Sequence, residues 1–275
     1  NFTIDVRDLN ETPTIANQTF SIAENSDNGT ELGQIVASDP DNGQSLTYEI
    51  VSGNNLGIFE ITTDGKLKVK DNTKLDYEQH QSVTLRVKVT DNGTPALSAE
   101  ADITINITDV NEAPNWTSAD QITINEDATS EHTLAATDPE NNPLTYSADN
   151  LPSWITLAGN KLTFNPTQTE VGEHNLTLKV SDGTNQTTQT FKVTVNNVND
   201  APVWTSANII TMNEKATLEH NLTATDEDGD SLTYSADNLP SWITLANNKL
   251  TLKPRASEIG THTITVKVSD GTMTV

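Results

Sequence analysis

Residues 144–158 read LTYSADNLPSWITLA, and the same letters return unchanged at residues 232–246. The identity extends outward into a gapless alignment of residues 113–187 with 201–275, at a constant offset of 88 positions. A sequence that repeats with a fixed period over this length folds as a row of similar units. The period is long enough for each unit to bury a core of its own.

A proline that follows an acidic stretch marks the start of each unit, at Pro13, Pro114 and Pro202. The first unit diverges more from the others and is longer. The sequence therefore predicts four segments: residues 1–12 as the last strand and linker of a preceding domain, 13–112 and 113–200 as complete domains, and 201–275 as a domain that lacks its last strand.

Alternating apolar and polar residues predict β-strands in every unit. In the runs VTLRVKVT at 83–90 and ITINIT at 103–108, every second residue is apolar. This period of two is typical of a strand with one buried face and one wet face. Turns such as Asn92-Gly93 and Asp182-Gly183 separate the runs. With about seven short strands per unit, we expect an all-β chain of tandem seven-stranded, Ig-like or cadherin-like antiparallel β-sandwiches in a linear array.

The composition excludes several classes of function. The chain has 39 acidic and 15 basic residues, a net charge of −24, so a nucleic acid is not an expected partner. It has no cysteine, which excludes disulfides, zinc–thiolate sites and thiol nucleophiles. No apolar run reaches the roughly 18 residues that a membrane span requires. The five histidines lie near no nucleophile motif, so we expect no enzyme activity.

Acidic residues recur at the ends of the predicted strands. The junctions read Asp109-Val-Asn-Glu-Ala-Pro and Asn197-Val-Asn-Asp-Ala-Pro, with a third copy at residues 8–13. About 25 residues after each comes an acidic turn, at 39–41, 138–140 and 226–228. Carboxylates spaced so regularly repel one another unless something neutralises them. A hard cation with oxygen ligands fits this role, and calcium fits better than magnesium, which prefers to keep several waters.

Each end of a sandwich gathers part of this pattern, and the bottom of one unit faces the top of the next. For the first junction, the predicted ligands are Glu24, Asp76, Glu78, Asp109, Asn111, Glu112, Asp138, Glu140 and Asp182. For the second they are Glu126, Asn197, Asn199, Asp200, Asp226, Asp228, Asp230 and Asp270. The equivalent set at the start of the chain is Asn10, Asp39, Asp41 and Asp91. The second junction lacks the middle acidic pair, so we expect it to bind fewer ions.

The first unit resembles a cadherin repeat over residues 13–114. The resemblance rests on Ala23-Glu-Asn, Asp39-Pro-Asp, Leu75-Asp-Tyr-Glu, Asp91 and Asp109-Val-Asn-Glu, which occur in the cadherin order. It implies that these motifs supply calcium ligands at domain junctions.

The second and third units resemble the shorter, dystroglycan-type cadherin-like domains of large bacterial surface proteins. They keep the early glutamate as Glu126 and Glu214 but lose the Leu-Asp-Tyr-Glu motif. Glu170 and Glu258 are candidates to replace it.

The resemblance implies a calcium-binding segment of an extracellular adhesin, at or outside a bacterial cell surface. Calcium at the junctions would stiffen the array, and the partners would be neighbouring domains of the same chain and other surface proteins or glycans. A glycan-binding module, or an accessory domain of a secreted polysaccharide-active protein, is the alternative. Exposed tryptophans would favour that alternative, and buried ones would count against it.

Overall fold

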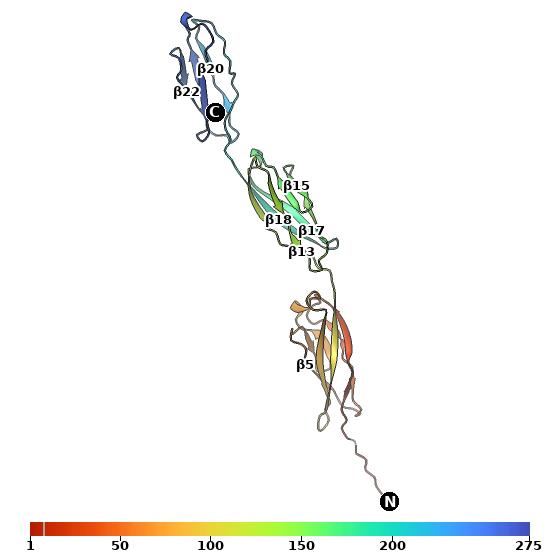
Figure 1. Ribbon diagram of the computed structural model, residues 1–275. Coiled ribbons are helices and arrows are strands. Elements are labelled where there is room, and N and C mark those ends of the chain that lie inside the picture. The colour runs from red at the N-terminus through yellow and green to blue at the C-terminus, as the bar shows by residue number, and fades with distance from the viewer. Residues whose placement is uncertain (8) are drawn as a thin grey trace. The chain divides into compact units, whose positions relative to one another are not determined.

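The computed structural model describes residues 1–7 and 9–275, so position 8 of the first junction signature lies outside the described residues. The chain divides into two compact units. The first contains residues 1–114 together with 138–143, and the second contains residues 115–137 together with 144–275. Both are built from strands, with single-turn 3-10 helices between them, which confirms the all-β prediction (Figure 1). None of the described helices is long and apolar enough to cross a membrane.

The first domain is a sandwich whose main sheet has the strand order β2-β9-β8-β5, faced by a sheet with the order β3-β7-β6. Two short strands, β1 and β4, pair at the side. The elements are β1 (Thr14–Ile15), β2 (Gln18–Ala23), β3 (Glu31–Gln34), β4 (Ala37–Ser38), β5 (Thr47–Ser52), β6 (Phe59–Ile61), β7 (Lys66–Val69), η1 (Asn72–Lys74), β8 (Ser82–Thr90) and β9 (Ser98–Thr108).

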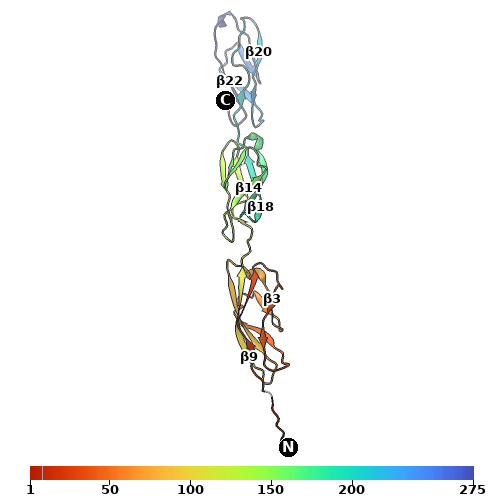
Figure 2. The same cartoon turned by 90° about the vertical axis from the view of Figure 1, so that its right-hand side faces the viewer.

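The second domain repeats this plan, with β11-β18-β17-β14 in one sheet and β12-β16-β15 in the other. Strands β14 and β18 of its larger sheet are labelled in Figure 2. Its elements are β10 (Asn115–Trp116), β11 (Gln121–Asn125), β12 (Ser130–Thr133), β13 (Ala136–Thr137), β14 (Thr145–Asp149), β15 (Ile155–Ala158), β16 (Lys161–Phe164), η2 (Gln168–Glu170), β17 (Gly172–Ser181) and β18 (Gln186–Asn196).

The third domain keeps the smaller sheet, β20-β24-β23, but only β22 and β25 of the larger one. Residues 209–213, which align with β11 at the offset of 88, form no strand. Its elements are β19 (Val203–Trp204), β20 (Leu218–Asn221), β21 (Ala224–Thr225), β22 (Thr233–Asp237), β23 (Ile243–Ala246), β24 (Lys249–Leu252), η3 (Ala256–Glu258) and β25 (Thr265–Ser269).

The alternating residues fill the core as expected. Leu85, Ile103 and Ile105 are fully buried between the sheets of the first domain. Leu162 and Phe191 take the same place in the second. Burial of each such side chain contributes roughly 1.5–3 kcal/mol relative to exposure. The hydrophobic effect therefore holds each sandwich together and leaves the loops at its ends free to carry polar groups.

One strand pairing in the larger sheet of the first two domains is parallel, although the other pairings are antiparallel. β2 pairs with β9 in parallel, and β11 pairs with β18 in the same way. In the first and second domains, an early strand and the last strand thus run side by side in one direction and end together. As a result, the residue after the early strand and the exit segment after the last strand meet at one end of the domain.

The strand expected over residues 1–8 is not formed in the described residues 1–7. Phe2, Ile4 and Val6 are almost fully exposed. None of the strands formed by the described residues pairs with this segment.

Candidate metal centres

The predicted ligands lie in three groups, which we name here. The N-terminal cluster is Asn10, Asp39, Asp41 and Asp91. The first junction cluster is Glu24, Glu78, Asp109, Glu112, Asp138 and Glu140. The second junction cluster is Asp200, Asp226, Asp228, Asp230 and Asp270, with Glu126 at the end of the second domain. The first two clusters belong to the first compact unit, and the third belongs to the second unit.

Glu24 organises the end of the first domain. It follows β2 and is only 2% exposed. Its Oε2 accepts a hydrogen bond from the Tyr77 N–H at 2.6 Å, and its Oε1 accepts one from the Val110 N–H at 2.8 Å. Hydrogen bonds to a carboxylate are stronger than those between neutral groups. This single side chain therefore ties β2 to both the middle motif and the exit segment.

Carboxylates gather around Glu24 in two overlapping groups. Ligand oxygens of Glu24, Glu78 and Glu112 lie within 4.8 Å of one another, and so do those of Glu78, Asp109 and Glu140. Glu78 is shared by both groups. Three carboxylates at this spacing match the oxygen-rich shell of a calcium ion, which takes six to eight oxygen ligands.

The loop of residues 138–143 brings further oxygens to the first junction cluster. The Glu112 N–H donates to Glu140 Oε2 at 3.4 Å, and Asn142 Nδ2 donates to Asn111 Oδ1 at 2.8 Å. Asp138 is 8% exposed and accepts a hydrogen bond at Oδ1 from the Asn142 N–H at 3.0 Å. The loop is thus held against the exit segment by the Glu140 carboxylate and the Asn142 side-chain amide.

Several buried carboxylate oxygens at this cluster have no hydrogen-bond donor among the described residues. They are Glu112 Oε2, Asp138 Oδ2 and Glu140 Oε1. A buried acceptor without a partner costs roughly 1–3 kcal/mol, and more when it is charged. Burial of these oxygens beside other carboxylates therefore lowers the stability of this end of the domain.

Two predicted ligands serve their own loops. Asp76 accepts hydrogen bonds at both carboxylate oxygens from Gln79, at 2.9 and 2.6 Å, and belongs to none of the groups of three among the described residues. Asp182 belongs to the second unit, where its Oδ1 accepts from the backbone of Thr184 and Asn185, both at 2.6 Å.

The second junction cluster centres on the loop of residues 226–230. Ligand oxygens of Asp226, Asp228 and Asp230 lie within 4.8 Å of one another. The Asp200 N–H donates to Asp228 Oδ2 at 2.6 Å, and Asn199 Nδ2 donates to Asp270 Oδ2 at 3.0 Å. One oxygen each of Asp200, Asp226 and Asp228 is buried without a hydrogen-bond donor among the residues described.

Gln168 is a site residue that sequence reasoning missed. With its amide nitrogen assigned toward Glu126, that nitrogen lies 2.7 Å from both Oε1 and Oε2 and 2.8 Å from Asn197 Oδ1, so its two N–H groups are shared among three acceptors. The alternation of apolar residues and the acidic motifs do not point to Gln168, because a single glutamine in a loop after a strand is common. An alignment of the segments after β7 and β16 could have indicated it, since Gln168 and the middle acidic pair occupy the same loop.

Glu170 and Glu258, the candidate replacements for the middle pair, have local roles instead. Glu170 Oε2 accepts from the Thr167 N–H at 2.9 Å and its Oε1 from Thr169 at 2.8 Å, which caps η2. Glu258 caps η3 in the same way, through the Arg255 N–H at 2.6 Å. Hydrogen bonds at an N-cap occupy these carboxylates.

The N-terminal cluster repeats the geometry of the second. Asn10 Nδ2 donates to Asp91 Oδ2 at 3.1 Å, and the Glu11 N–H donates to Asp41 Oδ2 at 2.8 Å. A Cβ on Gly93 would lie 1.7 Å from Asn10 Oδ1, so only glycine lets this amide approach. Asp39 Oδ1 accepts from the Asp41 N–H at 2.8 Å, while its Oδ2 is buried without a donor among the described residues.

Crowding of like charges alters the proton affinity of these groups. Burial, with the neighbouring Glu140 and Glu24 carboxyls, raises the pKa of Glu112 to about 7. Partial loss of hydration, with Glu24, Glu140 and Asp109 nearby, raises the pKa of Glu78. The pKa of Asp200 is raised in the same way, by burial and by Asp127, Asp228 and Asp226. The raised pKa values of these carboxyl groups thus reflect loss of hydration first and repulsion between neighbouring carboxylates second.

Basic residues do not supply that charge. The ion pairs of the described residues include Lys161 with Glu131 and Arg86 with Asp102, which lie on the sheets. None of the described pairs includes Glu24, Glu78, or Glu112. No ion pair among the described residues therefore offsets the charge of these three carboxylates.

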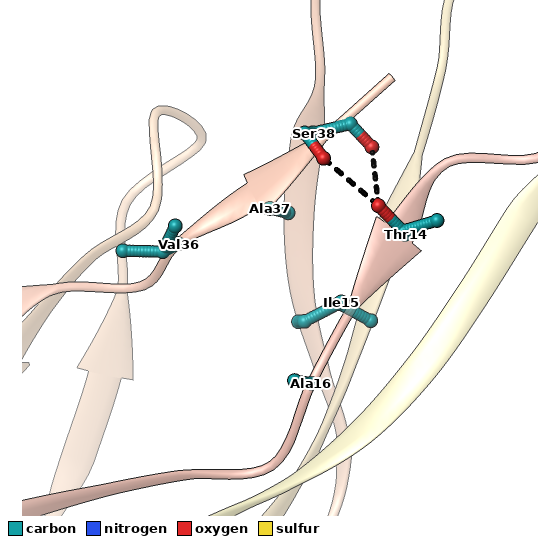
Figure 3. Close-up of a pocket in the computed structure, with 6 residues that line it drawn as sticks. All are labelled: Thr14, Ile15, Ala16, Val36, Ala37 and Ser38. Atoms are coloured by element: carbon teal, nitrogen blue, oxygen red, sulfur yellow. Dashed lines mark hydrogen bonds between the residues drawn. The ribbon is translucent and has the colours of Figure 1, made fainter. Parts of the chain in front are cut away.

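Neither the pockets nor the tryptophans offer a rival site. A shallow depression of about 290 Å³ beside β1 and β4 is lined by Thr14, Ile15, Ala16, Val36, Ala37 and Ser38. In Figure 3, Thr14 lies against Ser38, whose hydroxyl is 2.8 Å from its Oγ1. The lining of this depression contains no charged group.

The four tryptophans are partly buried and pack on the cores, as when Trp154 contacts His174 with ring centroids 5.1 Å apart. Such packing counts against an aromatic platform for glycans.

Comparison with protein families divides the chain in the same way as the fold. A family model described as Cadherin domain matches residues 18–108. A family model described as Bacterial Ig domain matches residues 111–196 and again 199–275.

Curated relatives and a solved structure that are similar to the chain are named as cadherins or protocadherins. Protocadherin Fat 1 of Homo sapiens is 32% identical over 234 residues, which are 74% of this chain and 5% of that protein. Protocadherin-like wing polarity protein stan of Drosophila melanogaster is 35% identical over 156 residues, 52% of this chain and 4% of that protein. The chain thus spans a small part of these relatives. Mouse Cadherin-23 EC22-24 matches in structure with a TM-score of 0.62, 21% identity and 94% coverage of both chains, which shows a shared fold.

Proposed function

The chain belongs to the bacterial Ig domain family, with two such domains following one cadherin domain, and on this premise we propose that it is a calcium-binding segment of an extracellular adhesion protein. Calcium ions at the two junction clusters would fix each domain to the loop that follows it. Cadherin relatives support the adhesive role, and the bacterial Ig match supports a place on a bacterial surface.

The observation that carries the proposal is the first junction cluster. Five carboxylates lie in two overlapping groups whose ligand oxygens are within 4.8 Å. Three oxygens of the cluster are buried without a hydrogen-bond donor among the described residues. Evolution of a purely structural loop would not favour this arrangement, because each unpaired carboxylate lowers the stability of the fold. A bound divalent cation would turn the same carboxylates into a stabilising group.

The donor set fits calcium. Glu24, Glu78 and Glu112 offer one group of hard oxygen ligands, and Asp109 and Glu140 complete the other with Glu78. The ion would supply positive charge and would be shared between the end of the first domain and the loop of residues 138–143. The chain's own contribution is to orient the ligands, as Glu24 does through the N–H groups of Tyr77 and Val110.

Binding would stiffen the link between consecutive domains. Without the ion, the carboxylates of the exit segment and of the loop repel one another. With it, ligands from both are held in one shell, and binding free energy becomes part of the folding free energy. A stiffened series of domains could present an adhesive module to other surface proteins or to glycans.

Thermal unfolding of the full chain, in chelator and in about 1 mM calcium, tests the proposal. A site occupied at 100 times its Kd adds about 2.7 kcal/mol, so the melting temperature should rise by several degrees. Glu78→Gln, which changes a partly hydrated ligand shared by both groups, should show a smaller rise. Glu60→Gln, an exposed acid on β6, is the matched control and should behave as wild type. Equal melting of wild type in chelator and calcium would contradict the proposal.

A further inference from the structure

Glu24 and Glu126 occupy equivalent positions in consecutive domains. The N–H of each donates to the last strand, Glu24 to Thr108 O and Glu126 to Asn196 O, both at 3.0 Å. The Oε1 of each accepts a hydrogen bond at 2.8 Å from the valine of the exit segment, Val110 or Val198. Each is almost fully buried, with exposures of 2% and 1%. Differences around the two carboxylates therefore arise from their neighbours and not from their backbone.

Those neighbours differ in charge. Glu24 has two further carboxylates, Glu78 and Glu112, within ligand distance. Glu126 belongs to none of the groups of three that the described residues form. Instead, the Gln168 amide donates to both of its oxygens at 2.7 Å and lies 2.8 Å from Asn197 Oδ1. Where the first domain has excess negative charge, the second has a neutral hydrogen-bond donor.

The backbone holds Gln168 in this position. The Asp127 N–H donates to Pro166 O at 2.9 Å, as the Asn25 N–H donates to Leu75 O at 3.1 Å in the first domain. Thr167 and Glu170 then form a capping box around η2, whose first residue is Gln168. The loop that supplies Glu78 in the first domain thus supplies an amide at the same place in the second.

We propose that Gln168 takes the place of a cation at Glu126. The inference rests on the proposed calcium function, which it deepens by locating the ions. The first junction cluster would bind cations on both the Glu24 side and the loop side. The second would bind on the loop side only, at Asp226, Asp228 and Asp230. The Glu126 side of that junction would be held together by hydrogen bonds and would not depend on calcium.

The third domain supports this interpretation through a different neutral pairing. At the constant offset of 88 positions, Glu214 corresponds to Glu126, Lys215 to Asp127 and Ala256 to Gln168. Glu214 forms an ion pair with Lys215 at 3.8 Å. The equivalent glutamate therefore has two further carboxylates within ligand distance in the first domain, a side-chain amide in the second and an exposed lysine in the third. Of the three, only Glu24 has added negative charge around it, beside the backbone N–H groups of Tyr77 and Val110 that donate to it.

Counting bound calcium on full-length variants by equilibrium dialysis tests the proposal. Gln168→Glu rebuilds the carboxylate pair of the first domain and should bind one more ion per chain than wild type. Gln168→Ala should bind the same number as wild type. Gln121→Glu, which adds an acid at an exposed position of β11 in the same domain, is the control and should bind no additional ion.

Unfolding in chelator gives a second readout that does not require any ion. Gln168→Ala leaves the buried Glu126 carboxylate short of two hydrogen bonds, so the second domain should melt about 4–8 °C lower. A loss of bound calcium in Gln168→Ala would overturn the proposal, because it would show that the Gln168 carbonyl is a ligand. An unchanged count in Gln168→Glu would overturn it as well. If wild type binds no calcium, the proposed function fails, while the melting of Gln168→Ala still decides whether the amide stabilises the buried Glu126 carboxylate by hydrogen bonds.

Discussion

Replacing Glu112 by glutamine should stabilise the first domain in chelator and weaken its calcium binding. In chelator, burial and the carboxyls of Glu140 and Glu24 raise the pKa of Glu112 from 4.5 to about 7. The folded state then holds a proton that the unfolded state releases. Below about pH 4.5, Glu112 does not change the free energy of unfolding. As the pH rises above this value the free energy of unfolding falls, and the whole loss is reached above about pH 7.

The size of the effect follows from that difference in pKa. One pKa unit corresponds to about 1.4 kcal/mol, so a fully shielded group would cost about 3 kcal/mol at pH 7.5. Glu112 is only partly buried, and solvent screening reduces the figure to about 1–2 kcal/mol. Glu112→Gln removes the charge, keeps an acceptor for Asn25 and gains a donor for Glu140. In chelator, the free energy of unfolding of Glu112→Gln should exceed that of wild type by this amount at pH 7.5 and should equal it at pH 4.5.

Urea unfolding in chelator at both pH values, with Glu60→Gln as the control, measures the effect. In calcium at pH 7.5 the sign should reverse, because the variant has lost a ligand. The reasoning is refuted if Glu112→Gln destabilises the apo first domain at pH 7.5, or if its effect is the same at pH 4.5.

The remaining predictions concern the fold and the alternative function. Phe164→Ala, at a fully buried position of β16, should cost about 3–5 kcal/mol of unfolding free energy, measured by denaturant titration; a cost below 1 kcal/mol would contradict the described core. Gly53→Ala should destabilise the first domain far more than Gly57→Ala, since a Cβ on Gly53 would lie 2.1 Å from Thr84 O while Gly57 has open space, although both have positive φ. Similar melting temperatures for the two variants would show that φ alone decides. Trp154→Ala should lower the melting temperature of the second domain, because Trp154 packs on its core; a loss of glycan binding with unchanged stability would support the glycan alternative instead.

The sequence was sufficient to predict the sandwiches because the core depends on a simple alternation. Val87 and Ile105, picked out by their period of two, are both fully buried. The constant offset also predicted that the second and third units share one plan, and their smaller sheets, β12-β16-β15 and β20-β24-β23, do correspond. The parallel pairing of β2 with β9 was not visible, because register between distant strands depends on long-range contacts.

The candidate site was only partly predictable. Carboxylates at strand ends indicated where charge gathers, and Glu24, Glu78 and Glu112 do meet. Composition could not show how each loop turns its side chains. Asp76 is drawn to Gln79 by local hydrogen bonds, and Glu170 caps its own turn. Gln168 carries no charge and matches no motif, so its contact with Glu126 emerges only from the fold.

The most direct test of the account is a crystal structure of the full chain grown in calcium, with the ions identified by anomalous scattering. The account predicts calcium on Glu24, Glu78 and Glu112 and on the 226–230 loop, with more ions at the first junction cluster than at the second and none on Glu126. A structure with both clusters empty at about 1 mM calcium, a concentration that weak extracellular sites bind, would contradict the central claim.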